Sequence, residues 1–132
     1  MLESDARPHV LVIDDDEVVC AVLREVFADD GLRATACVAP PADLDEVQRL
    51  APDLILLDLV YGGERSGHAF LERLKADPAT SAIPVVVCSA AVTDDDRAQL
   101  TGWECATLPK PFDLDELLRT VYDCLAATRA AA

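Results

Sequence analysis

A chain of 132 residues is long enough for one domain with one hydrophobic core, and an apolar content of 52% excludes an intrinsically disordered polypeptide. The formal net charge of −14, from 25 acidic and 11 basic residues, makes direct binding to nucleic acid or to an anionic membrane surface unfavourable. The plain interpretation of this charge is solubility; its functional interpretation is a cation site and attraction to basic partner surfaces.

The five cysteines form no metal-binding pattern, since none is paired at ligand spacing and their number is odd. Cys20, Cys88 and Cys124 lie in apolar runs, where cysteine behaves as a small hydrophobic residue. We therefore expect reduced thiols in a cytoplasmic protein. Residues 1–9 contain no apolar signal core, and no apolar run approaches the roughly 18 residues that span a bilayer.

In the first third of the chain, residues 10–13 are continuously apolar, which predicts a short strand covered on both faces. Gly31 offers a C-terminal stop for a helix that is expected from residue 17 to residue 30. The apolar residues of this helix form two adjacent stripes, Val18, Val22 and Val26, and Val19, Leu23 and Phe27. An alternating segment at 33–38 predicts an edge strand, and a short helix is expected at 42–50.

The remainder of the chain repeats this alternation. Strands are predicted at 53–59, 83–88 and 105–108, and helices at 68–76, 94–100 and 113–127. The segment 60–67, with sequence VYGGERSG, is expected to be a loop because it contains three glycines. The C-terminal ATRAAA is expected to fray. The apolar side of the last helix is predicted to consist of Leu114, Leu117, Leu118, Val121, Tyr122 and Leu125.

Five repeats of strand and helix predict an α/β fold with a parallel sheet, right-handed crossovers and helices on both faces. No linker or low-complexity tract interrupts the pattern, so we expect a single domain over residues 1–132 with a core at about 8–127. Ligand sites in such sheets lie beyond the carboxyl ends of the strands. These positions hold Asp14, Asp15, Asp16, Asp58, Ser89 and Lys110.

These side chains predict a phosphoryl-transfer site. Clustered carboxylates are tolerable where a divalent cation neutralises them, and oxygen ligands favour Mg²⁺, which often shares its ligand shell with a phosphate. A phosphoryl group on Asp58 would lie among the cation, the Ser89 hydroxyl and the Lys110 ammonium group. A strand order of second, first, third, fourth and fifth would place the two acidic strand ends side by side.

Each residue also has a simpler interpretation. Asp16 precedes a predicted helix and fits an N-cap as well as a site residue. A serine after a strand is usually a turn residue, and a lysine is usually solvated. Asp58 is harder to explain in this way, because an unpaired carboxylate beside buried sequence is costly. The joint arrangement at four strand ends favours a functional site.

The motifs VLVIDDDEVV, PDLILLDL, PVVVCSA and LPKPF, in this order, resemble the receiver domain of two-component response regulators over about residues 8–127. The resemblance implies a flavodoxin-like (βα)5 fold with sheet order 2-1-3-4-5 and a cis Lys110–Pro111 bond. It also implies Asp58 as phosphoacceptor, Ser89 and Lys110 as phosphate contacts, and Mg²⁺ as cofactor. The implied metal ligands are Asp14, Asp15, Asp58 and the backbone carbonyl of Val60.

The sequence departs from the family pattern in the loop after Asp58, at Thr107, and in the stretch TGWECAT, where the family usually has small residues and the bulk of Trp103 is unusual. The loop after Asp58 has Gly62 where the family usually has proline, and Gly67 stands one residue later than the family glycine. Thr107 occupies the position of an aromatic residue that reports the switch in the family. Trp103 lies nearby and is interpreted either as a partner contact or as a cover for a strand end.

The resemblance predicts a receiver module that accepts a phosphoryl group from a histidine kinase or phosphotransfer protein and is not an enzyme on an outside substrate. Its effector is unspecified, and a homodimer is a further hypothesis. The first alternative is a pseudo-receiver that binds partners without phosphorylation. The second is a haloacid-dehalogenase-like phosphatase, with Asp14 as nucleophile and Asp16 as acid. The sequence leaves open whether the chain is a stand-alone protein or part of a longer one.

Overall fold

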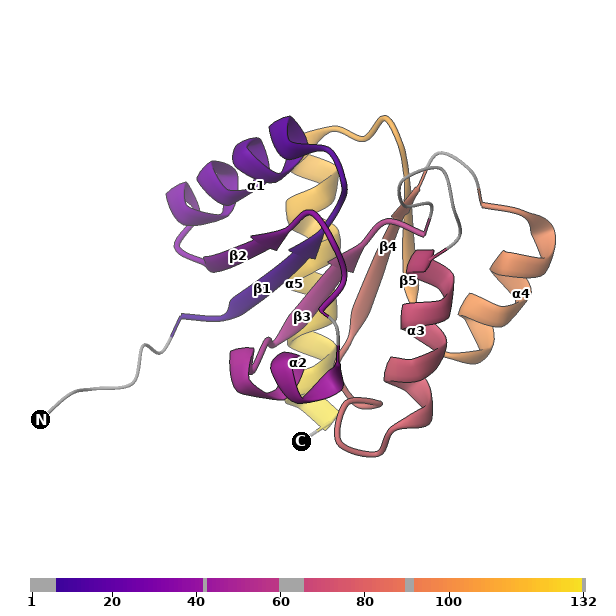
Figure 1. Cartoon of the computed structure of the whole chain (residues 1–132). Helices are drawn as coiled ribbons and strands as arrows, with labels where there is room; N and C mark the ends of the chain where they lie inside the picture. Colours follow the sequence, from indigo (N-terminus) through magenta and orange to yellow (C-terminus); the bar gives the residue numbers. More distant parts are fainter. Residues whose placement is uncertain (1–6, 42, 60–65, 90–91, 132) are drawn as a thin grey trace, which may run out of the picture.

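The computed structural model describes residues 7–41, 43–59, 66–89 and 92–131 (Figure 1). Strands and helices alternate along these residues, as the sequence predicts. The strands are β1 (His9–Ile13), β2 (Arg33–Cys37), β3 (Leu54–Leu57), β4 (Val85–Ser89) and β5 (Ala106–Pro109). The helices are α1 (Glu17–Asp29), α2 (Leu44–Leu50), α3 (Ser66–Ala76), α4 (Asp94–Gly102) and α5 (Leu114–Ala131).

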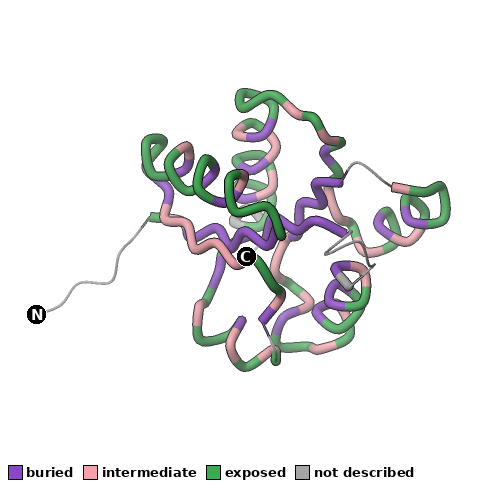
Figure 2. The backbone as a smooth tube through the Cα atoms, turned by 45° about the horizontal axis from the view of Figure 1, so that its top comes forward, coloured by how far each residue is buried: buried purple, intermediate pink, exposed green. Residues whose placement is uncertain are grey.

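All strand pairs are parallel, and the order in the sheet is β2-β1-β3-β4-β5. This confirms the expected topology and places the alternating segment β2 at an edge. The central strands β1, β3 and β4 are buried at every residue (Figure 2). Their continuous apolar sequences follow from this position, because each strand is covered on both faces.

Alternate residues of each strand point to opposite faces and so build two separate hydrophobic cores. Helices α1 and α5 cover one face, where Phe27 and Val121 are fully buried. Helices α2, α3 and α4 cover the other, where Phe70 of α3 and Leu100 of α4 are buried. The sheet is thereby held between two helical layers.

The structure shows which of the two apolar stripes of α1 faces the core, and it corrects the predicted apolar side of α5 at two positions. Val18 and Val22 are 71% and 45% exposed, because α1 turns its other stripe, with Leu23 and Phe27, toward the sheet. Leu114 and Tyr122 of α5 are also exposed, at 43% and 39%. The Tyr122 hydroxyl instead donates hydrogen bonds to the backbone oxygen and the carboxylate of Asp30.

Helix α5 continues to Ala131, four residues beyond its predicted end at residue 127. Its last turns are rich in alanine, the residue that favours helix most strongly. All five cysteines are free thiols, as expected. None of the helices among the described residues is long and apolar enough to cross a membrane.

Candidate functional site

The register of the sheet brings the first two acidic strand ends together. Val12 and Ile13 of β1 pair with Leu56 and Leu57 of β3. The next residues along the two strands are Asp14 and Asp58, and the Asp58 backbone N–H donates to the Ile13 oxygen at 3.0 Å. Two carboxylates that are far apart in sequence therefore emerge side by side at the edge of the sheet.

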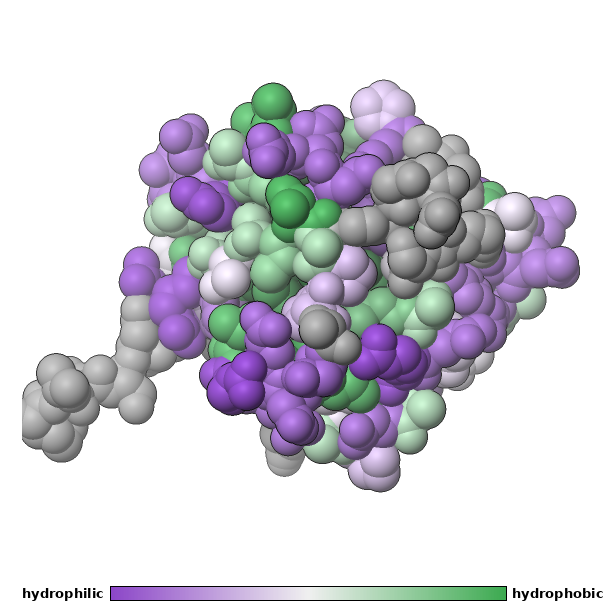
Figure 3. Space-filling view, in the orientation of Figure 1, coloured by the Kyte–Doolittle hydropathy of each residue, from purple (hydrophilic) through white to green (hydrophobic). Residues whose placement is uncertain are grey.

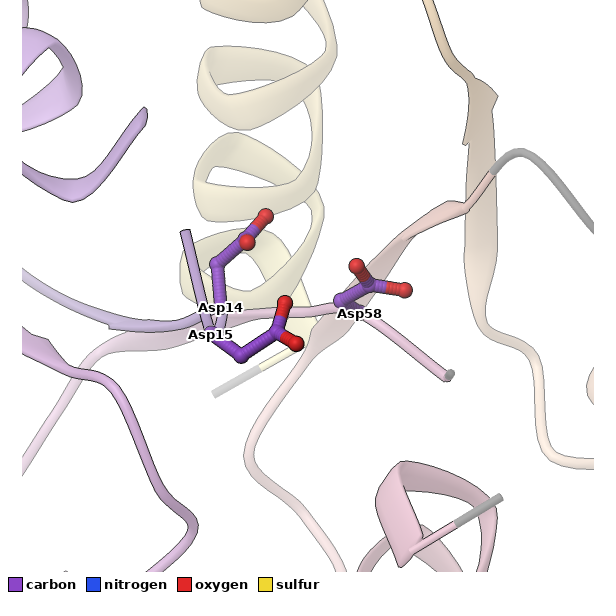
Figure 4. A group of neighbouring side chains, drawn as sticks. All are labelled: Asp14, Asp15 and Asp58. Carbon is purple, nitrogen blue, oxygen red and sulfur yellow. The ribbon is translucent and has the colours of Figure 1, made fainter. Parts of the chain in front are cut away.

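Asp14, Asp15 and Asp58 form a cluster in which one carboxylate oxygen of each lies within 4.8 Å of the others (Figure 4). Asp14 is 4% and Asp58 9% exposed, whereas Asp15 lies open to solvent. Three carboxylates with one accessible member fit a hard divalent cation that binds oxygen and keeps some of its water ligands. The donor set is therefore suited to Mg²⁺.

Asp16 does not join this cluster. Its side chain caps α1 by accepting hydrogen bonds from the backbone N–H groups of Val18 and Val19. Its own N–H donates to an Asp14 carboxylate oxygen at 2.9 Å, which helps to hold that side chain at the edge of the sheet. Of the three consecutive aspartates, Asp14 and Asp15 therefore belong to the carboxylate cluster, and Asp16 caps the start of α1.

Lys110 neutralises the two least exposed carboxylates. Its Nζ lies 2.6 Å from Asp14 Oδ2 and 3.1 Å from Asp58 Oδ2. Burial by itself would lower the pKa of the Lys110 ammonium group, but the hydrogen bonds and negative charges of Asp14 and Asp58 outweigh it and raise the pKa. Lys110 is therefore charged throughout the physiological range and offers a fixed positive group beside Asp58.

Ser89 ends β4 on the same edge and is 2% exposed. Its backbone oxygen accepts a hydrogen bond from the Lys110 N–H at 3.4 Å, which links the fourth strand to the lysine. The Lys110–Pro111 bond is cis, as expected from the family resemblance. Cys88 lies beneath this edge, and burial raises the pKa of its thiol to about 12, so it adds no charge below the cluster.

Thr107 is exposed on β5, and a cavity of about 110 Å³ opens between this strand and α4. Ser89, Val92, Arg97 and Thr107 are among the residues that line it. An aromatic ring at position 107 would fill more of this cavity than the threonine side chain does. The small side chain therefore leaves room between the predicted site and α4.

Gly67 lies very close to the backbone that follows β3. The sequence interpretation treated Gly67 as a loop glycine and did not predict this contact. A Cβ at this position would lie 2.1 Å from the Asp58 backbone oxygen and 2.8 Å from the Cα and oxygen of Leu59. Only glycine lets the start of α3 approach so closely. The signal available in the sequence was a glycine directly before a predicted helix and shortly after the acidic strand end.

The structure thus brings together Asp14, Asp15, Asp58 and Lys110, and it places Ser89 on the same edge of the sheet. The predicted carbonyl ligand of Val60, and most of the loop after Asp58, lie outside the described residues. Their roles stay predictions.

Comparison with known proteins gives a consistent result. Residues 10–122 match the family of response regulator receiver domains. The transcriptional activator protein PfeR of Pseudomonas aeruginosa is 37% identical over 115 residues, which cover 86% of this chain and 36% of PfeR. An uncharacterised 14.6 kDa protein of Leptolyngbya boryana is 32% identical over 129 residues, covering 95% of this chain and 96% of that protein.

Among solved structures, a CheY-like response regulator receiver domain protein from Methanospirillum hungatei superposes with a TM-score of 0.84. The match covers 96% of this chain and 100% of that one at 16% sequence identity, so it supports the fold alone. The chain spans only about a third of PfeR and of a protein-glutamate methylesterase from Anaeromyxobacter dehalogenans, 36% and 37% of their lengths.

The contact at Gly67 leads to a prediction about stability. Gly67→Ala should lower the free energy of unfolding by about 1–3 kcal/mol, because the added methyl group overlaps the backbone of Asp58 and Leu59. Gly102→Ala is the matched control, since a Cβ at this helical position meets nothing within 4 Å. It should leave stability unchanged or raise it by up to about 1 kcal/mol. Urea unfolding measures both, and equal effects would contradict the prediction.

Proposed function

Because this chain belongs to the family of response regulator receiver domains, we propose that it accepts a phosphoryl group on Asp58 in two-component signal transduction. The observation that carries the proposal is the position of Asp58, which lies next to both a carboxylate cluster suited to Mg²⁺ and the Lys110 ammonium group. A carboxylate oxygen of Asp58 lies within 4.8 Å of those of Asp14 and Asp15, and Asp58 Oδ2 lies 3.1 Å from the Lys110 ammonium nitrogen. Phosphoryl transfer is promoted by positioning of this kind and by positive charge beside the transferred group.

In the proposed reaction, an Asp58 carboxylate oxygen forms a bond to phosphorus while the bond between phosphorus and the donor's histidine nitrogen breaks. The electron pair of the broken bond stays on the donor's imidazole. Mg²⁺ held by Asp14, Asp15 and Asp58 would offset the negative charge of the phosphoryl oxygens. Lys110 would exchange its contact with Asp58 for one with the phosphoryl group, and the Ser89 hydroxyl would contact another oxygen.

Hydrolysis of the aspartyl phosphate by water would release inorganic phosphate and restore the Asp58 carboxylate. The chain would then catalyse only its own phosphorylation and dephosphorylation, with no external substrate. The phosphatase alternative gains no support, because Asp16, its proposed acid, caps α1. The pseudo-receiver alternative remains the one to separate by experiment.

A histidine kinase or phosphotransfer protein is the proposed donor, and the surface beside Lys110 is suited to such a partner. A hollow of about 380 Å³ is lined by Val19, Lys110, Pro111 and Phe112. Val18 and Val22 stand exposed on the same helix as Val19. Figure 3 shows apolar surface over the start of α1, at the top of the view. Exposed apolar side chains next to a reactive group are typical of a protein docking surface.

The acceptor assignment is tested by intact mass after treatment with acetyl phosphate and Mg²⁺. The wild-type chain should gain one phosphoryl group, and Asp58→Asn should gain none, because an amide is not a nucleophile of this kind. Asp53→Asn is the matched control. Asp53 directly precedes the first residue of β3, whereas Asp58 directly follows the last, and Asp53 accepts a hydrogen bond from the His9 N–H. It should be phosphorylated like the wild type. Phosphorylation of Asp58→Asn would show that the acceptor is another residue, and no phosphorylation of the wild type would favour the pseudo-receiver.

The cation site is tested by thermal unfolding. Mg²⁺ should raise the melting temperature by several degrees, because a cation at 100 times its dissociation constant adds about 2.7 kcal/mol to stability. Asp15→Asn should remove most of this response by deleting the accessible carboxylate of the cluster. Asp45→Asn, an exposed position in the first turn of α2, should keep the full response. Melting curves that do not change with Mg²⁺ would argue against a metal site.

The docking surface is tested by comparing two phosphoryl donors. The first donor is a histidine kinase that phosphorylates the wild type. The rate of phosphotransfer from this kinase should be about tenfold lower in the double variant Val18→Ser and Val22→Ser, because apolar contact area is lost. Phosphorylation by acetyl phosphate, which needs no docking, should keep its wild-type rate. If both donors slow equally, the variant disturbs the site and the docking assignment fails. If neither slows, the partner binds elsewhere.

A further inference from the structure

His68 is placed to connect α4 with the edge of the sheet that carries Asp58, which we call the acceptor edge. It follows Gly67, whose backbone lies directly against the backbone of Asp58 and Leu59. A change in the position of the Asp58 peptide would therefore press on the first turn of α3, since no side chain lies between them. His68 is the next residue along this turn, and its side chain is 17% exposed.

From this turn, the imidazole contacts α4 at several points along its length. His68 Nε2 lies 2.6 Å from the Gln99 side-chain oxygen and 3.8 Å from an Asp96 carboxylate oxygen. Its ring centroid lies 6.2 Å from that of Trp103, which caps the C-terminus of α4. With the Gln99 oxygen as acceptor, Nε2 carries the proton, and Nδ1 faces Glu72 of α3 at 3.5 Å.

Helix α4 buries little apolar surface among the described residues. The helix has nine residues, and Asp96 and Leu100 are the ones buried. Asp96 also closes a capping box with Thr93, so the carboxylate that His68 approaches is the one that fixes the helix start. A helix with so little buried apolar surface depends on polar contacts for its position, and such elements are the ones that shift most easily.

There is also space for α4 to move. The cavity of about 110 Å³ between α4 and β5 is lined by Arg97 on the helix and Thr107 on the strand. Thr107 is β-branched and small, so it cannot fill this space by rotating as a ring would. No aromatic side chain at position 107 can therefore carry a change at the Asp58 end of β3 to α4. The contacts of Gly67 with Asp58 and of His68 with α4 instead connect the two without interruption.

We propose that His68 is a positioning residue that transmits phosphorylation of Asp58 to α4 through its contact with Gln99. The proposal rests on the proposed function, because it assumes that the acceptor edge changes when Asp58 carries a phosphoryl group. Such a change can shift α4 only if the contacts of α4 differ between the two states. The His68–Gln99 hydrogen bond is a contact that spans the two helices and can differ in this way.

The test is a comparison of backbone amide chemical shifts without and with saturating beryllofluoride and Mg²⁺, which mimic the aspartyl phosphate. In the wild type, we expect changes at Ser89, at Gly67 and along Asp94–Gly102, and small changes at Cys105–Leu108. In His68→Leu, the changes along α4 should fall by about threefold or more, while those at Ser89 and Gly67 persist.

Matched variants separate coupling from general damage. Gln99→Met removes the other side of the same hydrogen bond and should reproduce the loss. His68→Gln keeps a side-chain N–H donor and should restore most of the α4 response. Thr101→Ala lies on the same helix, where the Thr101 hydroxyl donates only to the Arg97 backbone oxygen among the described contacts, and should behave like the wild type.

Three results would overturn the proposal. The first is an α4 response in His68→Leu as large as in the wild type. The second is a response at Cys105–Leu108 equal to that at Ser89, which would place the path on β5. Both leave the proposed function standing. The third is a wild-type chain that shows no change at Ser89 or Gly67, and this result would remove the proposed function together with the coupling.

Discussion

Three charged groups at one edge of the sheet, Asp14, Asp58 and Lys110, form the interaction on which the rest of the site depends. Parallel pairing of β1 with β3 forces the two carboxylates together, because Ile13 and Leu57 are partners in the register. Two carboxylates in a partly desolvated position repel each other unless a positive group compensates them. Lys110 does so from the end of β5, so four strands, β1, β3, β4 and β5, must pair correctly before the charges can balance.

This arrangement explains why the polar residues stand at the strand ends. The central strands β1, β3 and β4 are buried on both faces and consist mainly of apolar side chains, as in Leu54–Leu57. A carboxylate can be placed only where the chain leaves the core, and the carboxyl ends of parallel strands all leave at the same edge. The acidic cluster is thus partly buried, at Asp14 and Asp58, and partly open, at Asp15. This gradient suits a cation that enters from solvent and reaches the carboxylates beneath.

Small residues around this edge govern how far the site can communicate with the remainder of the molecule. Gly67 lets α3 touch the acceptor peptide, and Thr107 leaves a cavity where a ring would pack. The close contact at Gly67 couples the Asp58 backbone to α3 and His68. The cavity beside Thr107 weakens the packing between the site and β5. Helix α4, in which Asp96 and Leu100 are the buried residues, lies at the end of the path through His68. Packing, more than the charged groups, decides which helix can respond to the site.

The sequence by itself determined the order of strands and helices, because a change in apolar period is a local property of the chain. It also determined the candidates Asp14, Asp58 and Lys110, since polar residues directly after apolar runs must emerge at the edge of a parallel sheet. Tertiary structure alone decided which stripe of α1 faces the core, leaving Val18 and Val22 exposed. It alone set the His68 contact with Gln99, 31 residues away. Such features depend on how two helices lie across a sheet, and no local pattern records the distance between residues that only packing brings together.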